Sequence, residues 1–599
     1  MISVKQPQPT FRISLLRRFL SYTRPYQKSL IIALLLSVLL AAMAPLRPLL
    51  IQLTINKGIE PGQSSYFIHG VGGFIIEMTI LQVLLLLLES FLRYVFTFTT
   101  AALGQNVVRD LRNDTYSKIL QLNLRQFDQT PIGTLTTRTI NDIESVNDVF
   151  SDGLIPIIAD LLTIVAVLAY MLYTDWKITL ICLAPFPLLI LATYLFKESV
   201  NKSFVTVRNT VSQLNSFVQE HLSGMSVIQA FSAEEQERKK FEKINKEHRD
   251  ANIRAIFAYS VFFPFVELIS AFSIGLLVWW AAHQSTSAAE STSHLAGVIT
   301  SFVICLNLLF RPLRVIADKF NVLQMGMIAG ERVFKVLDND DVTTDEKREE
   351  AELKKFKGSV EFKDVSFAYI QDRYVLKNIS FSVPAGTTLA IVGHTGSGKT
   401  SIISLINRLY HANQGSISID GKPIDEISLK TLRRNIAVVL QDVFLFSGTI
   451  RDNITLHNPD IRQEQTEQAA KLIGMHDFIM RLPGNYDYQV MERGSALSAG
   501  QRQLLSFIRA LVYEPSILIL DEATSSVDTE SEQMIQQAIE KMIAGKTAII
   551  IAHRLSTIRK ADRILVMNEG VVHESGTHQE LLSKKGLYHQ LYGAQFAQI

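Results

Sequence analysis

Residues 388–410 read TLAIVGHTGSGKTSIISLINRLY, and this stretch carries the strongest structural signal in the chain. Its apolar start predicts a buried strand, its glycine-rich centre a tight loop, and its end a helix. The centre, Gly393 to Thr400 (the phosphate loop), has the pattern G-x-x-x-x-G-K-T in that context. Glycines let backbone N–H groups wrap phosphate oxygens, and the start of the helix adds positive potential. Lys399 is therefore expected to reach the β- and γ-phosphates of a nucleotide, and Thr400 to ligate Mg²⁺.

Two later strands are predicted to end in polar side chains that complete this site. Residues 516–520 form an apolar run that leads into Asp521 and Glu522, and residues 547–552 form another that leads into His553. The carboxyl ends of parallel strands meet at the edge of a sheet where ligands bind. We assign Asp521 to the Mg²⁺ shell, Glu522 to the attacking water, and His553 to the γ-phosphate. An exposed acidic turn and a structural histidine are the plainer alternatives when each residue is taken alone.

The chain divides by composition into a membrane part and a soluble part. Hydrophobic residues make up 48% and charged residues 19%, but these are averages over two unlike regions. Long apolar runs crowd the first 320 residues; after an acidic, lysine-rich stretch at 338–357, short strands alternate with amphipathic helices from about Gly358. This alternation predicts an α/β domain with a largely parallel sheet. The net charge of +2 gives no support for a nucleic-acid partner, and we expect none.

Six apolar stretches are long enough to cross a membrane, which takes about 20 residues. They are 29–55, 67–100, 153–173, 178–197, 255–282 and 295–317. The N-terminal segment and the two long connections hold twenty-one Lys and Arg residues, whereas the connections on the other side hold only Lys57 and Lys177. The positive-inside rule therefore predicts that both termini and the long connections are cytoplasmic. No small-residue cleavage site follows the first apolar run closely, so we expect it to be retained as a span.

The two long connections, between spans 2 and 3 and between spans 4 and 5, are polar but keep the apolar spacing of helices. We expect helical hairpins that continue the spans by several tens of ångströms, at about 1.5 Å per residue. The first tip is predicted at 127–135, where Pro131 and Gly133 break the helix. The second tip is predicted at 220–226, where Gly224 breaks it. Ordinary solvated loops are the alternative.

Ionisable residues in or near the apolar stretches mark functional sites by default. They are Glu77, Glu89, Arg93, Asp160 and Glu267. Glu89 and Arg93 are four residues apart and are expected to pair on one helix face. Glu267 is the better candidate for a polar group that lines a central cavity. Cys182 and Cys305 lie inside apolar runs and are expected to be buried thiols.

Residues 497–501 read LSAGQ, and here the chain resembles the ATP-binding cassette (ABC) transporters, whose signature reads LSGGQ. The resemblance covers essentially the whole chain, because further motifs come in the family's order. Met491 to Gly494 match the loop before the signature, and Ser526 to Asp528 match the D-loop. Tyr369 matches the aromatic residue that stacks on adenine, and Gln441 matches the loop glutamine that senses Mg²⁺ and contacts the membrane domain. The six-span layout with two hairpins looks like the exporter branch.

The resemblance implies which residues contact ATP. The expected nucleotide-binding residues are Tyr369, Gly393, Thr395, Gly396, Ser397, Gly398, Lys399, Thr400, Ser401, Gln441, Ser498, Gly500, Gln501 and Asp528; the expected Mg²⁺ ligands are Thr400, Gln441 and Asp521; the expected catalytic residues are Glu522 and His553, the latter as the switch histidine. It also implies a dimer, because ATP in this family is sandwiched between the phosphate loop of one nucleotide-binding domain and the signature of the other. Closure of the sandwich draws the hairpins together and turns the cavity outward, and hydrolysis resets it.

Two departures from the family pattern bear on the partner. Ala499 stands where the signature has glycine, and the D-loop reads SSVD where many homodimers have SALD. A methyl group at residue 499 is expected to crowd ATP or to require a changed backbone angle. Lys399, Glu522 and His553 are intact, so the chain resembles the catalytically complete subunit of heterodimeric bacterial multidrug exporters. We therefore expect a heterodimer with a second half-transporter.

Together these motifs predict a polytopic α-helical membrane domain, with six transmembrane helices and long cytoplasmic extensions, fused to an α/β nucleotide-binding domain of the phosphate-loop type. The expected bounds are 1–325 for the membrane domain, 326–357 for a linker and 358–599 for the nucleotide-binding domain. The expected function is ATP-driven export of hydrophobic or amphipathic small molecules across the cytoplasmic (inner) membrane by alternating access. A lipid flippase of the same architecture and an ATP-gated channel or receptor stay open as alternatives.

Overall fold

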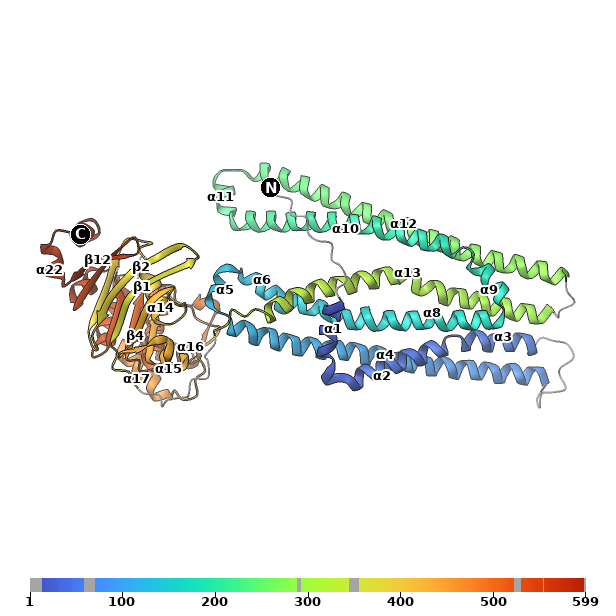
Figure 1. Cartoon of the computed structure of the whole chain (residues 1–599), viewed down its shortest axis with the longest axis horizontal. Helices are drawn as coiled ribbons and strands as arrows, with labels where there is room; N and C mark the ends of the chain where they lie inside the picture. The colour runs from blue at the N-terminus through green and yellow to red at the C-terminus, as the bar shows by residue number, and fades with distance from the viewer. Residues whose placement is uncertain are drawn as a thin grey trace. The chain divides into compact units, whose positions relative to one another are not determined.

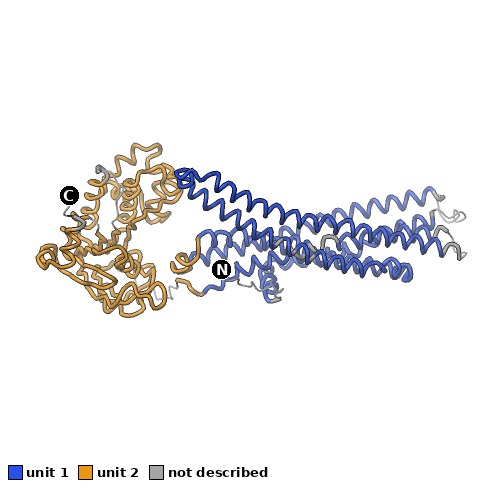
Figure 2. The backbone as a smooth tube through the Cα atoms, turned by 90° about the horizontal axis from the view of Figure 1, so that it is seen from above, with its two compact units in different colours: residues 1–120, 132–339 blue, residues 121–131, 340–599 orange. Residues whose placement is uncertain are grey.

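The computed structural model describes residues 13–58, 70–287, 292–343, 355–521, 529–552 and 554–596. The chain forms two compact units, which Figure 2 shows in blue and orange. The first contains residues 1–120 and 132–339, and the second contains residues 121–131 and 340–599. The chain therefore passes from one unit to the other three times: after Leu120, after Pro131 and after Asn339.

The first unit is built of helices, most of them long (Figure 1). They are α1 (Ile13–Tyr22), the short 3-10 helix η1 (Arg24–Tyr26), α2 (Gln27–Met43), α3 (Leu46–Gly58), α4 (Gly70–Gln121), α6 (Ile132–Thr137), α7 (Ile143–Asp148), α8 (Ile155–Thr174), α9 (Trp176–Leu183), α10 (Phe186–Ser223), α11 (Met225–Ala230), α12 (Glu234–Ser287) and α13 (Thr292–Leu337).

Among the described residues, six helical segments are long and apolar enough to cross a membrane. They are Arg24–Lys57, Gly72–Gln121, Ile132–Thr174, Trp176–Ser223, Glu234–His283 and Leu295–Leu313. The expectation of six spans is confirmed, as is the expectation that helices continue past the apolar runs: α4 extends to Gln121 and α10 to Ser223 without a break.

The third span contains two π-helical segments, η3 (Arg138–Asp142) and η4 (Val149–Leu154). Such segments are rare and often lie at functional sites. Gly326 of α13 lies so close to this span that an added Cβ would be 2.3 Å from Val149 Cγ2 and 2.6 Å from the carbonyl oxygen of Ser145. α13 packs this tightly because residue 326 has no side chain.

Both hairpin tips turn near the predicted places. At the first tip, α5 (Leu124–Gln129) is followed by Thr130 in an extended conformation, because a proline disfavours the helical conformation of the residue before it. Gly133 lies inside α6 and does not break the helix, contrary to the expectation. At the second tip, Gly224 ends α10 and α11 begins at the next residue, as predicted.

Charged side chains of the spans pair across and along helices. Glu89 Oε1 lies 2.9 Å from an amine of Arg93, as the spacing predicted. Asp160 of α8 lies 2.5 Å from Lys319 Nζ of α13, and both side chains are about three-quarters buried. The side chain of Glu267 is exposed, and its role in a cavity stays a prediction. Cys182 and Cys305 are buried free thiols, as expected.

The second unit contains a mixed six-stranded sheet with the spatial order β12-β11-β3-β10-β9-β6, and all its neighbouring pairs except β11–β12 are parallel. Its strands are β3 (Thr388–Gly393), β6 (Ile436–Val439), β9 (Ile517–Asp521), β10 (Thr547–Ile551), β11 (Arg563–Asn568) and β12 (Val571–Gly576). A four-stranded antiparallel sheet contains β1 (Val360–Ile370), β2 (Arg373–Val383), β4 (Gln414–Ile419) and β5 (Lys422–Pro423), and a two-stranded sheet joins β7 (Gly448–Thr449) to β8 (Gln489–Val490). The α/β architecture was predicted; the antiparallel sheet was not.

Helices cover both faces of the six-stranded sheet. They are α14 (Lys399–Ile406), α15 (Leu429–Asn435), α16 (Ile450–Thr455), α17 (Gln463–Ile473), α18 (His476–Arg481), α19 (Ala499–Val512), α20 (Thr529–Ile543) and α21 (Leu555–Lys560), and α22 (His578–Ser583) and α23 (Leu587–Phe596) follow the last strand.

Alternate residues of the strands divide the interior of the second unit into two cores, because neighbouring side chains of a strand point to opposite faces. On one face, Val392 of β3 and Leu520 of β9 pack with α16, α17, α19 and α20. On the other face, Ile391 and Ile519 pack with α14 and with the antiparallel sheet. The helix that follows the phosphate loop and the helix that follows the signature thus lie on opposite faces of one sheet.

Candidate nucleotide-binding site

The phosphate loop connects β3 to α14 through a backbone that requires glycine. Gly398, which caps the start of α14, has φ 97°, a left-handed conformation that residues with a Cβ rarely adopt. A Cβ there would also lie 2.5 Å from Leu376 Cδ2 of β2. At Gly393 a Cβ would lie 2.2 Å from the carbonyl oxygen of Met567. The predicted strand–loop–helix order is therefore present, and the loop fits closely against β2 and β11.

Lys399 is the first residue of α14 and is largely buried. Its Nζ donates hydrogen bonds of 2.9 Å to the carbonyl oxygens of Gly393 and His394, so the ammonium group lies over the loop. Burial lowers the pKa of Lys399, and the negative charge of Asp521 partly opposes this shift. Asp521 is the last residue of β9 and is buried. The structure thus brings the loop lysine and the first strand-end acid to the same edge of the sheet.

The remaining polar groups of the loop also fit a triphosphate and a cation. The hydroxyl of Ser397 is buried and has no hydrogen-bond partner within the described part of the chain. An unsatisfied buried hydroxyl is costly unless a ligand supplies the missing bond. Thr400, on the first turn of α14, is exposed, and its hydroxyl together with the Asp521 carboxylate provides the oxygen ligands that Mg²⁺ prefers. Thr395 and Gly396 are exposed on the same loop.

Tyr369 lies next to the phosphate-loop helix. Its hydroxyl is 3.1 Å from Ser401 Oγ on α14. Its ring meets two other aromatic rings edge-on: Phe367 at 4.7 Å and Tyr410 at 5.0 Å between centroids. Tyr410, just after α14, is a residue that sequence reasoning did not single out. In the sequence, Tyr410 is marked only as an aromatic residue at the end of the helical pattern that follows the phosphate loop.

Gln441 follows the carboxyl end of β6, which is the neighbour of β9 in the sheet. Because β6 and β9 are parallel, this places Gln441 beyond the same sheet edge as Asp521. The Gln441 side chain is exposed. Phe444 and Phe446, a few residues later, are more than half exposed and contact each other edge-on.

The signature segment, 497–501, forms the start of α19. Ser498 caps the helix: its Oγ accepts from the backbone N–H of Gln501 at 3.2 Å, and its own N–H donates to Gln501 Oε1 at 2.9 Å. The hydroxyl proton of Ser498 therefore stays available for an anion. Gly500 is buried, and Ala499 is exposed at the first helical position. Within the described residues, no hydrogen bond joins the signature segment to the phosphate loop.

Ala499 does not need an unusual backbone. It lies in the first turn of a right-handed helix, and it is absent from the residues with positive φ. Of the two effects expected from this methyl group, a changed backbone angle is therefore wrong. Crowding of ATP by the exposed methyl group stays a prediction.

Two family models and several relatives match the chain. The model described as "ABC transporter transmembrane region" matches residues 30–312, and the one described as "ABC transporter" matches residues 376–525. An "ATP-dependent lipid A-core flippase" of Syntrophus aciditrophicus (strain SB) is 32% identical over 98% of this chain and 95% of its own length. The chain belongs to the ABC transporters.

A second relative and a solved structure refine the place of this ABC transporter in the family. A "Probable multidrug resistance ABC transporter ATP-binding/permease protein YheH" of Bacillus subtilis (strain 168) is 36% identical, over 86% of this chain and 76% of its own length. The structure of a bacterial Atm1-family ABC exporter with ATP bound matches with a TM-score of 0.76 and 26% identity, over 95% of this chain and 98% of that one. This ABC transporter is therefore a multi-pass membrane exporter that hydrolyses ATP, from a family whose members work as dimers in the bilayer.

Three predicted site residues of this ABC transporter, Glu522, Asp528 and His553, lie outside the described residues. The residues before two of them are described: β9 ends at Asp521, and β10 ends at Ile551 in register with it. Their assigned roles stay predictions.

Helix α5, at the first hairpin tip of this ABC transporter, belongs to the second unit and reaches the aromatic cluster of Phe367, Tyr369 and Tyr410. The hydroxyl of Tyr410 donates to the carboxylate of Asp128 in α5. Burial and the neighbouring Asp128 raise the pKa of Tyr410, so its hydroxyl stays protonated and donates at neutral pH. Asp128, Tyr410 and Tyr369 thus form a continuous contact from α5 to the phosphate-loop helix.

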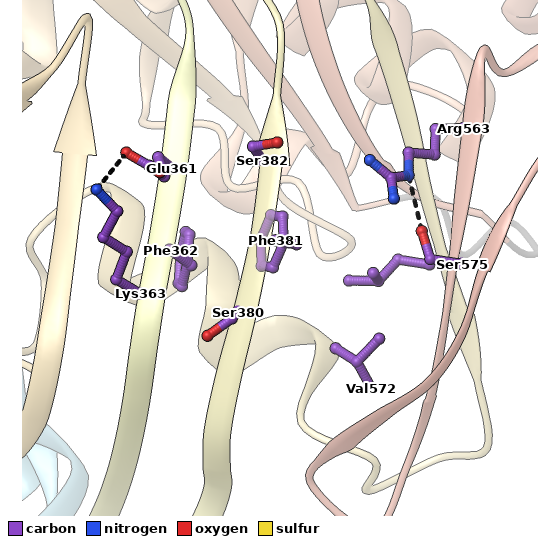
Figure 3. Close-up of a pocket in the computed structure, with 10 residues that line it drawn as sticks. Glu361, Phe362, Lys363, Ser380, Phe381, Ser382, Arg563, Val572 and Ser575 are labelled. Atoms are coloured by element: carbon purple, nitrogen blue, oxygen red, sulfur yellow. Dashed lines mark hydrogen bonds and ion pairs between the residues drawn. The ribbon is translucent and has the colours of Figure 1, made fainter.

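A separate cavity of about 340 Å³ opens between the two larger sheets (Figure 3). Its walls carry two polar pairs, Glu361 with Lys363 at 3.2 Å and Arg563 with Ser575 at 2.8 Å. None of the predicted site residues lines it. It lies at the beginning of β1 and β11, whereas the phosphate loop follows the end of β3, which is parallel to β11. The cavity is therefore not the nucleotide site.

Proposed function

We propose that this chain is one half of a dimeric exporter that moves hydrophobic or amphipathic small molecules out of the cell by alternating access. One observation carries the proposal: α14 and α19 lie on opposite faces of the same sheet. A single chain of this shape offers a phosphate-binding surface on one side and an anion-binding helix start on another. Two chains facing each other would complete two ATP sites, each with a phosphate loop from one chain and a signature from the other.

Each residue of the site is proposed to act as the sequence motifs imply. The phosphate loop and Lys399 hold the phosphates, and Tyr369 stacks on adenine. Thr400, Gln441 and Asp521 would hold Mg²⁺, which supplies positive charge against the γ-phosphate. Glu522 orients and deprotonates the attacking water, and His553 contacts the γ-phosphate. Across the dimer, the partner's ATP is contacted by a set that comprises Ser498, Gly500, Gln501 and Asp528.

The domain bounds and the orientation are part of the same proposal. Residues 1–325 form the membrane domain, 326–357 the linker and 358–599 the nucleotide-binding domain. Both termini lie in the cytoplasm and the spans lie in the cytoplasmic membrane, because twenty-one Lys and Arg residues lie on that side against two on the other.

The two hairpin tips have different partners in this proposal. The first tip carries α5, which is already joined to Tyr410 of the same chain. The second tip exposes large apolar side chains: Leu222 is 66% exposed and Phe231 is 79% exposed. Apolar side chains so exposed at the end of a long hairpin mark an interaction site. We infer that the second tip docks on the nucleotide-binding domain of the partner.

A heterodimer is proposed over a homodimer because of Ala499. Ala499 is exposed at the start of α19, and in this proposal its methyl group would face the partner's γ-phosphate. A site that contains it is better suited to hold ATP than to turn it over, whereas Lys399 and Asp521 of this chain are well placed for hydrolysis. The two ATP sites of the complex would then differ, as in heterodimeric multidrug exporters.

The substrate class is supported by the names of relatives, which point two ways. One relative is named as a probable multidrug resistance protein and another as a lipid A-core flippase. A lipid flippase is therefore the second candidate. Both substrates are amphipathic, so the choice between them rests on experiment.

Reconstituted vesicles that contain the full complex test the proposal. With MgATP on the side of the nucleotide-binding domains, the complex is expected to move a fluorescent amphipathic dye, and the same complex with Lys399→Ala is expected not to. Movement of labelled lipid without dye would favour the flippase. ATP hydrolysis with neither movement, accompanied by an ion current, would replace export by a gated channel.

A further inference from the structure

The N-terminal helix α1 is anchored in the first unit by a buried phenylalanine. Phe19 is 1% exposed and packs against Phe150 and Phe334, with ring centroids 6.4 Å and 5.2 Å away. Gly330 of α13 makes the room, since a Cβ there would lie 2.0 Å from Phe19 Cζ. In Figure 1 α1 lies beside α13. Helix α1 is therefore packed against α13, the last helix of the first unit.

Arg18, next to Phe19, holds the end of α13. Its two terminal amines donate hydrogen bonds of 2.5 Å each to the two carboxylate oxygens of Asp338, 320 residues away. The guanidinium also lies 4.1 Å from the centre of the Phe334 ring. This fork-to-fork geometry fixes direction as well as distance. The hydrogen bond raises the pKa of Arg18 and lowers that of Asp338, so both stay charged at neutral pH.

The pair is too exposed to contribute much stability. The Arg18 side chain is 37% exposed and that of Asp338 is 56% exposed, and ion pairs at such sites usually add little to folding. Its position is more informative than its strength. Asp338 is the first residue after α13, and the chain enters the second unit at Asp340.

The same N-terminal segment also holds α4. Tyr22 Oη donates to Asp114 at 3.2 Å, and Tyr26 Oη donates to Asp110 at 2.6 Å. Arg109 in turn donates to Tyr26 Oη at 2.7 Å. These contacts lie within the last three and a half turns of α4, whose chain enters the second unit at Gln121.

The chain segments that follow α4 and α13 are also hydrogen-bonded to each other directly after they enter the second unit. The backbone N–H of Asn123 donates to the carbonyl of Asp341 at 3.1 Å, and that of Thr343 donates to the carbonyl of Gln121 at 2.7 Å. The side chain of Asn123 adds a bond of 2.5 Å to the Asp341 carboxylate. Two of the three connections between the units are thus tied together on both sides of the boundary, by α1 on one side and by this short pairing on the other.

We propose that α1 is a strap that makes the ends of α4 and α13 move as one body, and that Arg18 is a positioning residue for the coupling of ATP hydrolysis to movement of the membrane helices. The inference rests on the proposed function. Without the strap, α13 and α4 separate when ATP moves the second unit, and part of that displacement is lost before it reaches the spans. With the strap, both connections transmit the same displacement.

Hydrogen–deuterium exchange of the full-length complex in lipid nanodiscs tests the strap, with and without MgATP and vanadate. In the wild type, the phosphate loop and the far ends of α3 and α8 are both expected to change their exchange. In Arg18→Ala the phosphate loop is expected to respond as before, while the response of α3 and α8 falls about fivefold, within the usual range of coupling between sites. Arg17→Ala, which removes the same charge from an exposed position of the same helix, is expected to behave as the wild type.

Further variants separate the strap from a loss of folding. Asp338→Asn leaves α1 and Phe19 in place and is expected to reproduce the Arg18→Ala result. Arg18→Lys keeps the charge but cannot bind both carboxylate oxygens in parallel, so its α3 and α8 response is expected to lie between those of the wild type and Arg18→Ala. The reversed pair, Arg18→Asp with Asp338→Arg, is expected to recover most of that response. An equal α3 and α8 response in wild type and in both single neutral variants would overturn the strap. Absence of that response in the wild type would overturn the proposed function, and the strap with it.

Discussion

Lys399 is a charged residue that the phosphate loop holds in a buried position. Its ammonium is buried, which lowers its pKa, and two loop carbonyls and the charge of Asp521 hold it in place. Buried charges with shifted pKa values cluster at functional sites. The burial and contacts of Lys399 therefore support its proposed place in the nucleotide site.

Lys399→Ala is expected to weaken ATP binding by roughly tenfold or more, because about 1.4 kcal/mol is the least that a lysine–phosphate contact in a sheltered loop should contribute. Binding of a fluorescent ATP analogue and steady-state hydrolysis measure this. Lys422→Ala, on the exposed strand β5, serves as the control. Near-normal hydrolysis in Lys399→Ala would contradict the assignment of the phosphate site.

Glu522→Gln is expected to bind ATP normally and to lose about 10² to 10⁴ of its turnover, the usual contribution of a general base. The amide keeps the shape of the side chain and removes its ability to take a proton. ATP binding and phosphate release measured on the same sample separate the two effects. A variant that still hydrolyses ATP rapidly would show that another group is the base.

Pairing between distant residues is what the sequence could least predict. The phosphate loop and the Glu89–Arg93 pair follow from local spacing, and the structure contains both. Asp160 was recognised as an intramembrane charge, but its partner Lys319 is 159 residues later. Arg18 and Asp338 are farther apart still, and nothing in either local pattern links them. These contacts depend on how helices pack, which spacing along one helix does not encode.

At the scale of elements, spans and hairpins were largely predictable because apolar runs and helix breakers act locally. Gly224 ends α10 as expected, since glycine is a common helix terminator. The π-helical segments η3 and η4 were not predicted, because nothing in the apolar pattern marks them; both contact α13. The antiparallel sheet was missed because its strands have the same β-branched character as those of the parallel sheet, so composition does not separate the two.

The close packing of α13 against the third span leads to a stability prediction. Gly326→Ala is expected to destabilise the protein by about 1–3 kcal/mol, because the new methyl group meets a backbone carbonyl that cannot move aside easily. Thermal unfolding of the detergent-solubilised chain measures this. Gly275→Ala is the matched control: it lies inside α12 with nothing within 4 Å of an added Cβ, so it is expected to be neutral or slightly stabilising. Equal melting temperatures for the two variants would contradict the packing argument.

The contact between α5 and Tyr410 gives a second prediction at this scale. Tyr410→Phe removes one hydrogen bond to the Asp128 carboxylate and is expected to cost about 1 kcal/mol in local stability. Hydrogen exchange within 121–131 should therefore rise about fivefold. Tyr374→Phe, on the exposed part of β2, is the control. If exchange within 121–131 stays at the wild-type rate, Tyr410 does not anchor the tip.

At the scale of the whole molecule, the proposed ATP sites need a second chain, because α14 and α19 lie on opposite faces of one sheet. Native mass spectrometry of the complex isolated from its own membranes is expected to show this chain of 67.3 kDa bound to a different half-transporter. A complex of twice that mass, active without any other chain, would replace the heterodimer by a homodimer. In that case Ala499→Gly should change hydrolysis at both sites, whereas in a heterodimer it should leave the main rate nearly unchanged.

The three passages of the chain between its units also dictate an order of events during biosynthesis. The ribosome releases residues 121–131 long before it makes Asp341, Thr343 and Tyr410, the groups that receive them. The nascent α5 must therefore wait beside a partly inserted membrane domain until translation is more than two-thirds complete. A recombinant fragment that starts after the last span lacks residues 121–131, so Tyr410 has lost its hydrogen-bond partner Asp128. Supplying the 121–131 peptide in trans would restore that hydrogen bond.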